Sequence, residues 1–172
     1  MKKTLLSIAL GLVISTHFAT AQPTTPDTAK APLLVTEFRP QAQQIQAANM
    51  TAEFLTRFHY KATPLDDEMS EKIFDRYLKS LDPDHVFFLQ SDIDQFSAAR
   101  TKLDDAILNQ DLGVPFAMFN LYQKRFKERL TYARELLESD FDFTAKEAYK
   151  YQRDKEPWPK DEAAMRDLWR QR

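Results

Sequence analysis

Residues that commonly carry enzyme chemistry are sparse in this chain of 172 residues, and their densest cluster is short. Asp82, Asp84 and His85 place two carboxylates and one imidazole close together, a set of groups that could ligate a metal ion. However, Pro83 favours a turn, and Asp side chains in turns bond to neighbouring backbone N–H groups. The sequence also has no histidine pair at positions i and i+4. We therefore interpret the cluster as a turn with local caps, with a metal site as the alternative.

The other candidates for acid–base or nucleophilic chemistry are better explained by helix ends. His59 lies where a helix is expected to end, and residues 66–68 are acidic where the next should begin, as the helix dipole favours. No serine of the expected mature chain sits in a glycine-flanked elbow: these are Ser70, Ser80, Ser91, Ser97 and Ser139. The sequence therefore predicts no catalytic, cofactor-binding or metal-binding residue, and no cofactor.

Composition restricts the fold that must position these residues. Two glycines leave few positions for tight turns, which disfavours hairpin-rich β folds and glycine-rich phosphate loops. Cysteine is absent, so disulfides and thiolate sites are excluded. Lys and Arg number 24 against 26 Asp and Glu, which gives no basic surplus for nucleic acid. The expected class is all-α.

Apolar residues at helical spacing predict four to five helices in an irregular domain. The expected helices cover residues 41–59, 67–81 and 92–109, then a long helix with an apolar face from Phe119 to Leu137, and a last one from about Asp161. Asp66 and Ser91 are expected caps of the second and third helices. In the first helix, the candidate core residues are Ile45, Phe54, Leu55 and Phe58; in the last, Met165, Leu168 and Trp169 are expected on one side. The chain is expected to end inside that helix.

The N-terminus has the pattern of a secretory signal peptide. Two lysines precede the apolar run of residues 5–14, and Ala19 and Ala21 suit the −3 and −1 positions of a cleavage site. The run is too short to span a bilayer. We therefore expect a signal peptide over residues 1–21, a disordered leader over 22–37 and a helical domain over 38–172, in a periplasmic protein with no membrane span after cleavage.

The large number of aromatic residues indicates a surface for a partner. Thirteen phenylalanines are many for this length, so we expect some of the aromatic side chains to meet another domain, with Phe87, Phe88, Trp158 and Trp169 as candidate contacts. The Trp158 loop and the helix around residues 165–169 are expected to be under-packed. The basic residues of the long helix, Lys124, Arg125, Lys127, Arg129 and Arg134, are interpreted as a solvated face, with phosphate binding as the alternative.

Two stretches resemble the N-terminal region of the tail-specific protease family, also called carboxy-terminal processing proteases. The first comprises residues 72–78, 81–82, 91–92 and 96; the second includes residues 120–122, 124–126, 128–129, 142–144, 157–160 and 168–169. The resemblance runs from about residue 53 to residue 169 in the family's order.

This resemblance implies part of a periplasmic serine endopeptidase that trims or degrades proteins from apolar C-termini. In that family a PDZ domain and a protease core with a Ser/Lys dyad follow the helical region, and no residue here corresponds to that dyad. The implied role is non-catalytic scaffolding, in contact with those domains, with substrates and with a helical-repeat lipoprotein adaptor. The alternative is a free-standing periplasmic helical adaptor or chaperone.

Overall fold

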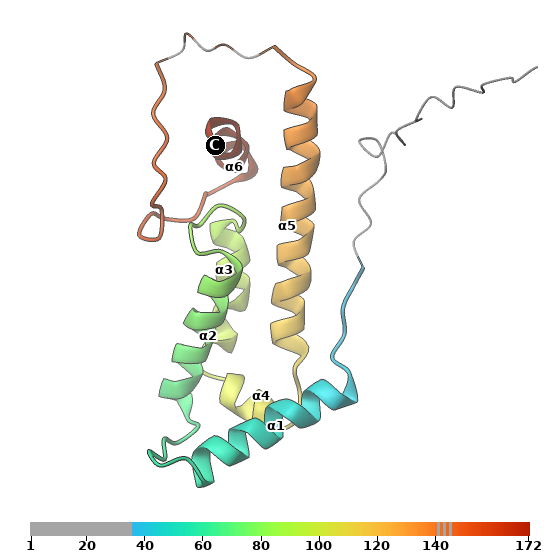
Figure 1. The fold of residues 1–172 in the computed structure, drawn as a ribbon, viewed down its shortest axis with the longest axis vertical. Coiled ribbons are helices and arrows are strands. Elements are labelled where there is room, and N and C mark those ends of the chain that lie inside the picture. The colour runs from blue at the N-terminus through green and yellow to red at the C-terminus, as the bar shows by residue number, and fades with distance from the viewer. Residues whose placement is uncertain (1–35, 141, 143, 145) are drawn as a thin grey trace, which may run out of the picture. The chain divides into compact units, whose positions relative to one another are not determined.

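The computed structural model describes residues 36–140, 142, 144 and 146–172. The expected signal peptide, with Ala19 and Ala21, and most of the expected leader lie outside these residues. The described part contains six α-helices, one 3-10 helix and no strand, so the all-α prediction is confirmed (Figure 1). The elements are α1 (Ala42–Arg57), α2 (Asp67–Leu81), α3 (Gln90–Phe96), η2 (Ser97–Ala99), α4 (Leu103–Leu108), α5 (Gly113–Leu137) and α6 (Glu162–Gln171).

Helix α2 matches its prediction residue for residue. The Asp66 carboxylate accepts the Met69 N–H at 3.0 Å and so caps the first turn. Phe74 and Leu78, one turn apart, are buried and join Phe88, Leu103 and Met118 in the main core cluster. Helical spacing and a capping residue were sufficient here because the apolar side of α2 lies on that core.

The expected third helix is interrupted, which corrects the prediction. Its residues form α3, η2 and α4, with a break between Arg100 and Leu103. The buried Ser70 hydroxyl donates to the Arg100 carbonyl at 2.9 Å and accepts the Leu103 N–H at 2.7 Å. A side chain of α2 therefore satisfies backbone groups that a continuous helix would have paired internally.

The start of α3 also differs from the expectation. Its N-cap is Leu89 rather than Ser91, and the Asp92 carboxylate accepts the Leu89 N–H at 2.9 Å. Ser91 is exposed one position inside the helix. The capping group is thus an acidic side chain at the third helical position, which bonds back to the cap residue.

Helices α5 and α6 pack against each other (Figure 1). Gly113 is the first residue of α5. The buried residues of α5 are Met118 and Arg125, whereas Leu137 at its far end is exposed, so the predicted apolar face continues beyond the core. Helix α6 begins as predicted, because the Asp161 carboxylate accepts the Ala164 N–H at 2.8 Å.

Helix α1 corrects the predicted core. Phe54, Leu55 and Phe58 are exposed, and α1 has no buried residue against the described chain. It packs mainly against α4, where the Asn49 side chain donates to the Ile107 carbonyl. In the described residues, no helix is both long and apolar enough to cross a membrane.

Candidate interaction site

The polar centre of the domain is Asp82, directly after α2. Its side chain is completely buried, and its two oxygens accept the N–H groups of Val86, Phe87 and Phe88 at 2.8–3.1 Å. The indole N–H of Trp158 donates to the same carboxylate at 3.2 Å. A buried carboxylate is stabilised by several such donors. This confirms the interpretation of the cluster as a turn with local caps and shows that Asp82 also fixes a distant loop.

His85 completes this turn with backbone in the left-handed region, at φ 53°. Its ring stacks on Trp158 with the two centroids 3.7 Å apart, and its Nδ1 lies within hydrogen-bonding distance of the Glu156 carbonyl. A positive φ is costly for a residue with a side chain. The stacking and the hydrogen bond offset this cost, so His85 contributes to loop positioning.

A second buried network connects α3 to α5. The Arg125 guanidinium donates to both oxygens of Asp92, at 2.8 and 2.9 Å, and Asp92 also accepts the Leu89 N–H. Arg125 donates further to Glu128 at 2.9 Å. Its pKa is raised, chiefly by the hydrogen bond with Asp92, so it stays charged. Two-point pairing of this kind fixes orientation as well as charge.

These networks support the docking of α6. The Trp169 indole N–H donates to the Val86 carbonyl at 2.6 Å, and Trp169 packs with Leu89 and Met165 in a second core cluster. The Gln90 N–H bonds to the Pro159 carbonyl at 2.9 Å, which fixes the chain just before α6. Helix α6 is therefore held by buried hydrogen bonds as well as by apolar contact.

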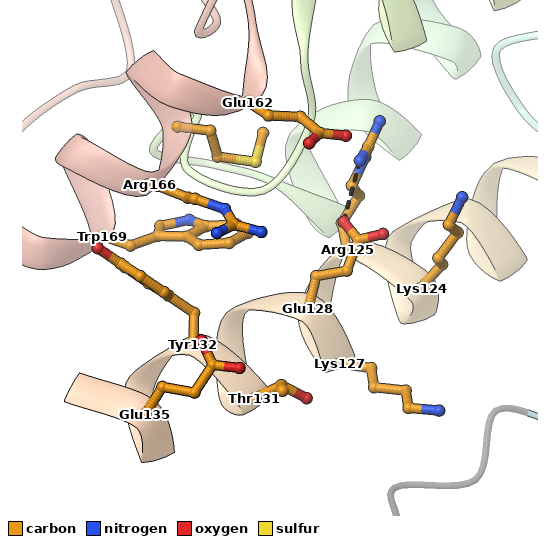
Figure 2. A pocket seen from close by; sticks show the side chains of 11 residues that line it. Lys124, Arg125, Lys127, Glu128, Thr131, Tyr132, Glu135, Glu162, Arg166 and Trp169 are labelled. Atoms are coloured by element: carbon orange, nitrogen blue, oxygen red, sulfur yellow. Dashed lines mark hydrogen bonds and ion pairs between the residues drawn. The ribbon is translucent and has the colours of Figure 1, made fainter. Parts of the chain in front are cut away.

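A pocket of about 400 Å³ lies between α5 and α6 (Figure 2). Tyr132, Met165 and Trp169 give it an apolar part, and the Arg166 guanidinium lies 5.6 Å from the centre of the Tyr132 ring. The remaining lining is charged: Lys124, Arg125, Lys127, Glu128, Glu135 and Glu162, with the uncharged Thr131. The pocket thus combines an apolar floor with charges of both signs.

The outer side of α1 is a second candidate contact surface, which we call the α1 face: Met50, Phe54 and Phe58, spaced four residues apart. Their exposed fractions are 59%, 60% and 71%. Exposed large apolar residues aligned on one helix side are typical of interaction surfaces. This surface was missed by the sequence reasoning, which assigned Phe54 and Phe58 to the core.

The hydroxyl groups of three serines have structural partners. Ser70 bonds to backbone at the α2–α4 junction, while Ser80 and Ser97 donate to carbonyls three residues earlier. Among the described residues there is no group of three His, Asp or Glu side chains placed to hold a metal ion.

The four predicted partner contacts fall into two classes. Phe88 and Trp169 are buried, with exposed fractions of 1% and 9%, so they are corrected to core residues. The expected under-packing of α6 is also wrong, because Met165 is 1% exposed. Phe87 and Trp158 are half-buried, and their contact with a partner stays a prediction.

The residues of the predicted basic face of α5 also differ in their exposure to solvent. Arg125 is buried in its network with Asp92, whereas Lys124 is exposed. Arg129 is partly buried and lies over the Phe87 ring; burial, with the nearby charge of Arg172, lowers its pKa. The solvated-face interpretation therefore fails at Arg125, whose partner Asp92 is 33 residues away in sequence.

Comparison with known proteins gives one consistent result. The family described as Tail specific protease N-terminal domain matches residues 51–172. A protein named Tail-specific protease from Haemophilus influenzae is 43% identical over 116 residues, which are 67% of this chain and 17% of that protein. The chain therefore spans about a sixth of the length of this relative.

Proposed function

Because this chain belongs to the tail-specific protease family through its N-terminal domain, we propose that it is a non-catalytic helical scaffold in a periplasmic serine endopeptidase. The proposed enzyme processes or degrades proteins from their C-termini with a Ser/Lys dyad. The proposed contacts of this domain are the PDZ and protease domains, protein substrates with apolar C-termini, and a helical-repeat lipoprotein adaptor.

The observation that carries this proposal is the family match over residues 51–172. Over that stretch, buried polar groups are engaged in holding elements together: Ser70 joins α2 to α4, Asp82 holds the Trp158 loop, and Arg125 joins α5 to α3. A polar core that fixes the arrangement of helices is what a scaffold requires.

Two surfaces are available to such a scaffold. The α1 face offers large apolar side chains without a described covering element, and the α5–α6 pocket offers an apolar floor with charged edges. Partner contact needs this combination of apolar anchors and a polar rim. We assign the contacts with other domains to these surfaces, together with the half-buried Phe87 and Trp158.

A complementation experiment tests the proposal. The chain without residues 1–21 is assayed for hydrolysis of a peptide with an apolar C-terminus, alone and after addition to the Haemophilus influenzae protease deleted for the matching region. We expect no hydrolysis by the chain alone and restored hydrolysis in the mixture. The deleted protease alone and heat-denatured chain are the controls.

Hydrolysis by the chain alone would contradict a non-catalytic role. Failure to restore activity, with both partners shown to be folded by circular dichroism, would contradict the scaffold role. Localisation is tested separately by fractionation of cells that express the full chain, in which the processed product is expected in the periplasmic fraction.

The second candidate function is a free-standing periplasmic adaptor or chaperone, and the α1 face favours it. Chaperones bind unfolded clients through exposed apolar surface, which Met50, Phe54 and Phe58 provide. Suppression of the aggregation of an unfolded model protein by the chain alone, lost when these residues are replaced by serine, would support this function over the first.

A further inference from the structure

The segment of residues 36–40, here called the strap, is attached to α5 by its main chain. The Phe38 N–H donates to Asn120 Oδ1 at 2.9 Å, and Asn120 Nδ2 donates to the Phe38 carbonyl at 2.8 Å. One carboxamide thus satisfies both main-chain groups of one residue, as a neighbouring strand does in a sheet and as receptors for extended peptides do.

An aromatic contact accompanies this main-chain pairing. The Phe38 ring meets Phe119 edge-on, with the centroids 5.8 Å apart. A groove of about 640 Å³ is lined by the strap and by Gly113, Ala117, Leu121 and Lys124 of α5. The strap therefore forms one wall of this groove and α5 forms the other, with Phe38 held on α5 by Asn120 and Phe119.

The attachment of the strap is weak. Phe38 is 44% exposed, and both hydrogen bonds to Asn120 are exposed. The charged neighbours Glu37 and Arg39 are largely exposed and pair with each other at 3.6 Å. Segments with little burial and exposed hydrogen bonds open at a low cost in free energy. Another segment of similar chemistry can therefore compete for the same groups.

We propose that the face of α5 around Asn120 is a binding site for an extended peptide with an aromatic residue, and that the strap occupies this site in cis. The Asn120 carboxamide pairs with the main chain of the aromatic residue, and Phe119 contacts its ring. Lys124 in the groove favours an acidic residue next to the aromatic one, as Glu37 is next to Phe38. This peptide site does not depend on the proposed protease role.

The test measures binding of a fluorescent peptide with the strap's own sequence, Thr-Glu-Phe-Arg-Pro, by anisotropy. The protein is the chain without residues 1–21, unmodified or with Phe38→Gly, which weakens the competing strap. We expect the Phe38→Gly chain to bind at least about tenfold more tightly, because the competent state is more populated. Adding Asn120→Leu should abolish binding, and so should alanine in place of phenylalanine in the peptide.

The matched control is Gln123→Leu, a change of the same type on α5 outside the groove lining, which should leave binding unchanged. Circular dichroism and thermal melting verify that each variant is folded. Absence of binding by folded Phe38→Gly chain, or binding that survives Asn120→Leu, would overturn the proposal. As a second measurement, hydrogen exchange at the Phe38 amide should accelerate in Asn120→Leu; an unchanged rate would show that Asn120 does not hold this residue and would also overturn it.

Discussion

Helices α6 and α1 carry similar apolar residues but differ in whether the rest of the domain buries them. Met165, Leu168 and Trp169 of α6 are all buried, whereas the three residues of the α1 face are exposed. Trp169 has a buried hydrogen bond to Val86 and the neighbours Leu89 and Tyr132, while the described polar link from α1 to α4 is the bond from Asn49 to Ile107.

This difference shows that an amphipathic pattern predicts which side of a helix is apolar but not what packs against that side. Helix α1 turns small residues, among them Ala48 and Ala52, and also Leu55 toward a groove shared with α2 and α4, whereas the three residues of the α1 face do not line this groove. Helix α6 turns its large residues toward the segment of residues 86–89, whose backbone N–H groups are held by the carboxylates of Asp82 and Asp92.

The largest effect is expected from Asp82→Ala. Four N–H groups, two in buried and two in partly buried hydrogen bonds, lose their acceptor, and each buried group left unsatisfied costs about 1–3 kcal/mol. We expect a loss on the order of 5 kcal/mol in urea unfolding, with exchange protection lost first in α6. Asp82→Asn keeps the shape and should lose less. Asp84→Ala, at a partly exposed neighbour, is the control; equal losses at the two positions would contradict this account.

Arg125→Met tests the second support of α6. It leaves Asp92 buried with the Leu89 N–H but without a cation, and breaking such a pair costs about 3–5 kcal/mol. The matched control is Arg170→Met, which breaks exposed pairs with Glu147 and Asp167 worth about 0–1 kcal/mol. Similar free energies of unfolding for the two variants would show that burial of the pair is not the deciding factor.

Met165→Ala and Phe54→Ala compare the two helices directly. Truncation at the buried Met165 should cost about 2–5 kcal/mol, because it removes contacts and leaves a cavity. Truncation at the exposed Phe54 should change stability by less than about 0.5 kcal/mol. Thermal and urea unfolding measure both. A Phe54 loss as large as that at Met165 would mean that the α1 face is covered in solution.

The smallest effect concerns alkaline pH. Burial raises the pKa of Tyr77, whose hydroxyl donates to the Pro115 carbonyl at 2.9 Å. The folded chain therefore holds this proton to higher pH than the unfolded chain, so its contribution is complete below the unfolded pKa near 10 and declines as pH rises above it. Tyr77→Phe should cost about 1 kcal/mol at pH 7 and flatten the alkaline decline.

Tyr60→Phe is the control for that measurement, because Tyr60 is 94% exposed beyond the end of α1. It should alter neither the stability at pH 7 nor the shape of the alkaline unfolding curve. An alkaline decline in Tyr77→Phe as steep as in the unmodified chain would assign the effect to another group, with the half-buried Tyr122, whose pKa burial also raises, as the next to test.

Local signals predicted some elements well and others poorly. Asp66 and Asp161 predicted helix starts because an N-cap acts within three residues. The break between α3 and α4 was not predictable, because the groups that fill it belong to Ser70 in another helix. Arg125 looked like one of several surface cations, and only pairing with Asp92 across 33 positions distinguishes it.

The sequence by itself determined the helical class, the starts of α2 and α6 and, through an ordered resemblance along most of the domain, the family that the comparisons then showed. These properties depend on local spacing, capping and residue identity, which a linear chain carries in full. Tertiary structure alone decided that Trp169 and Phe88 are core, that Arg125 is buried, and that Phe54 and Phe58 are exposed. Burial depends on which segments meet, and residues far apart in the chain set that together.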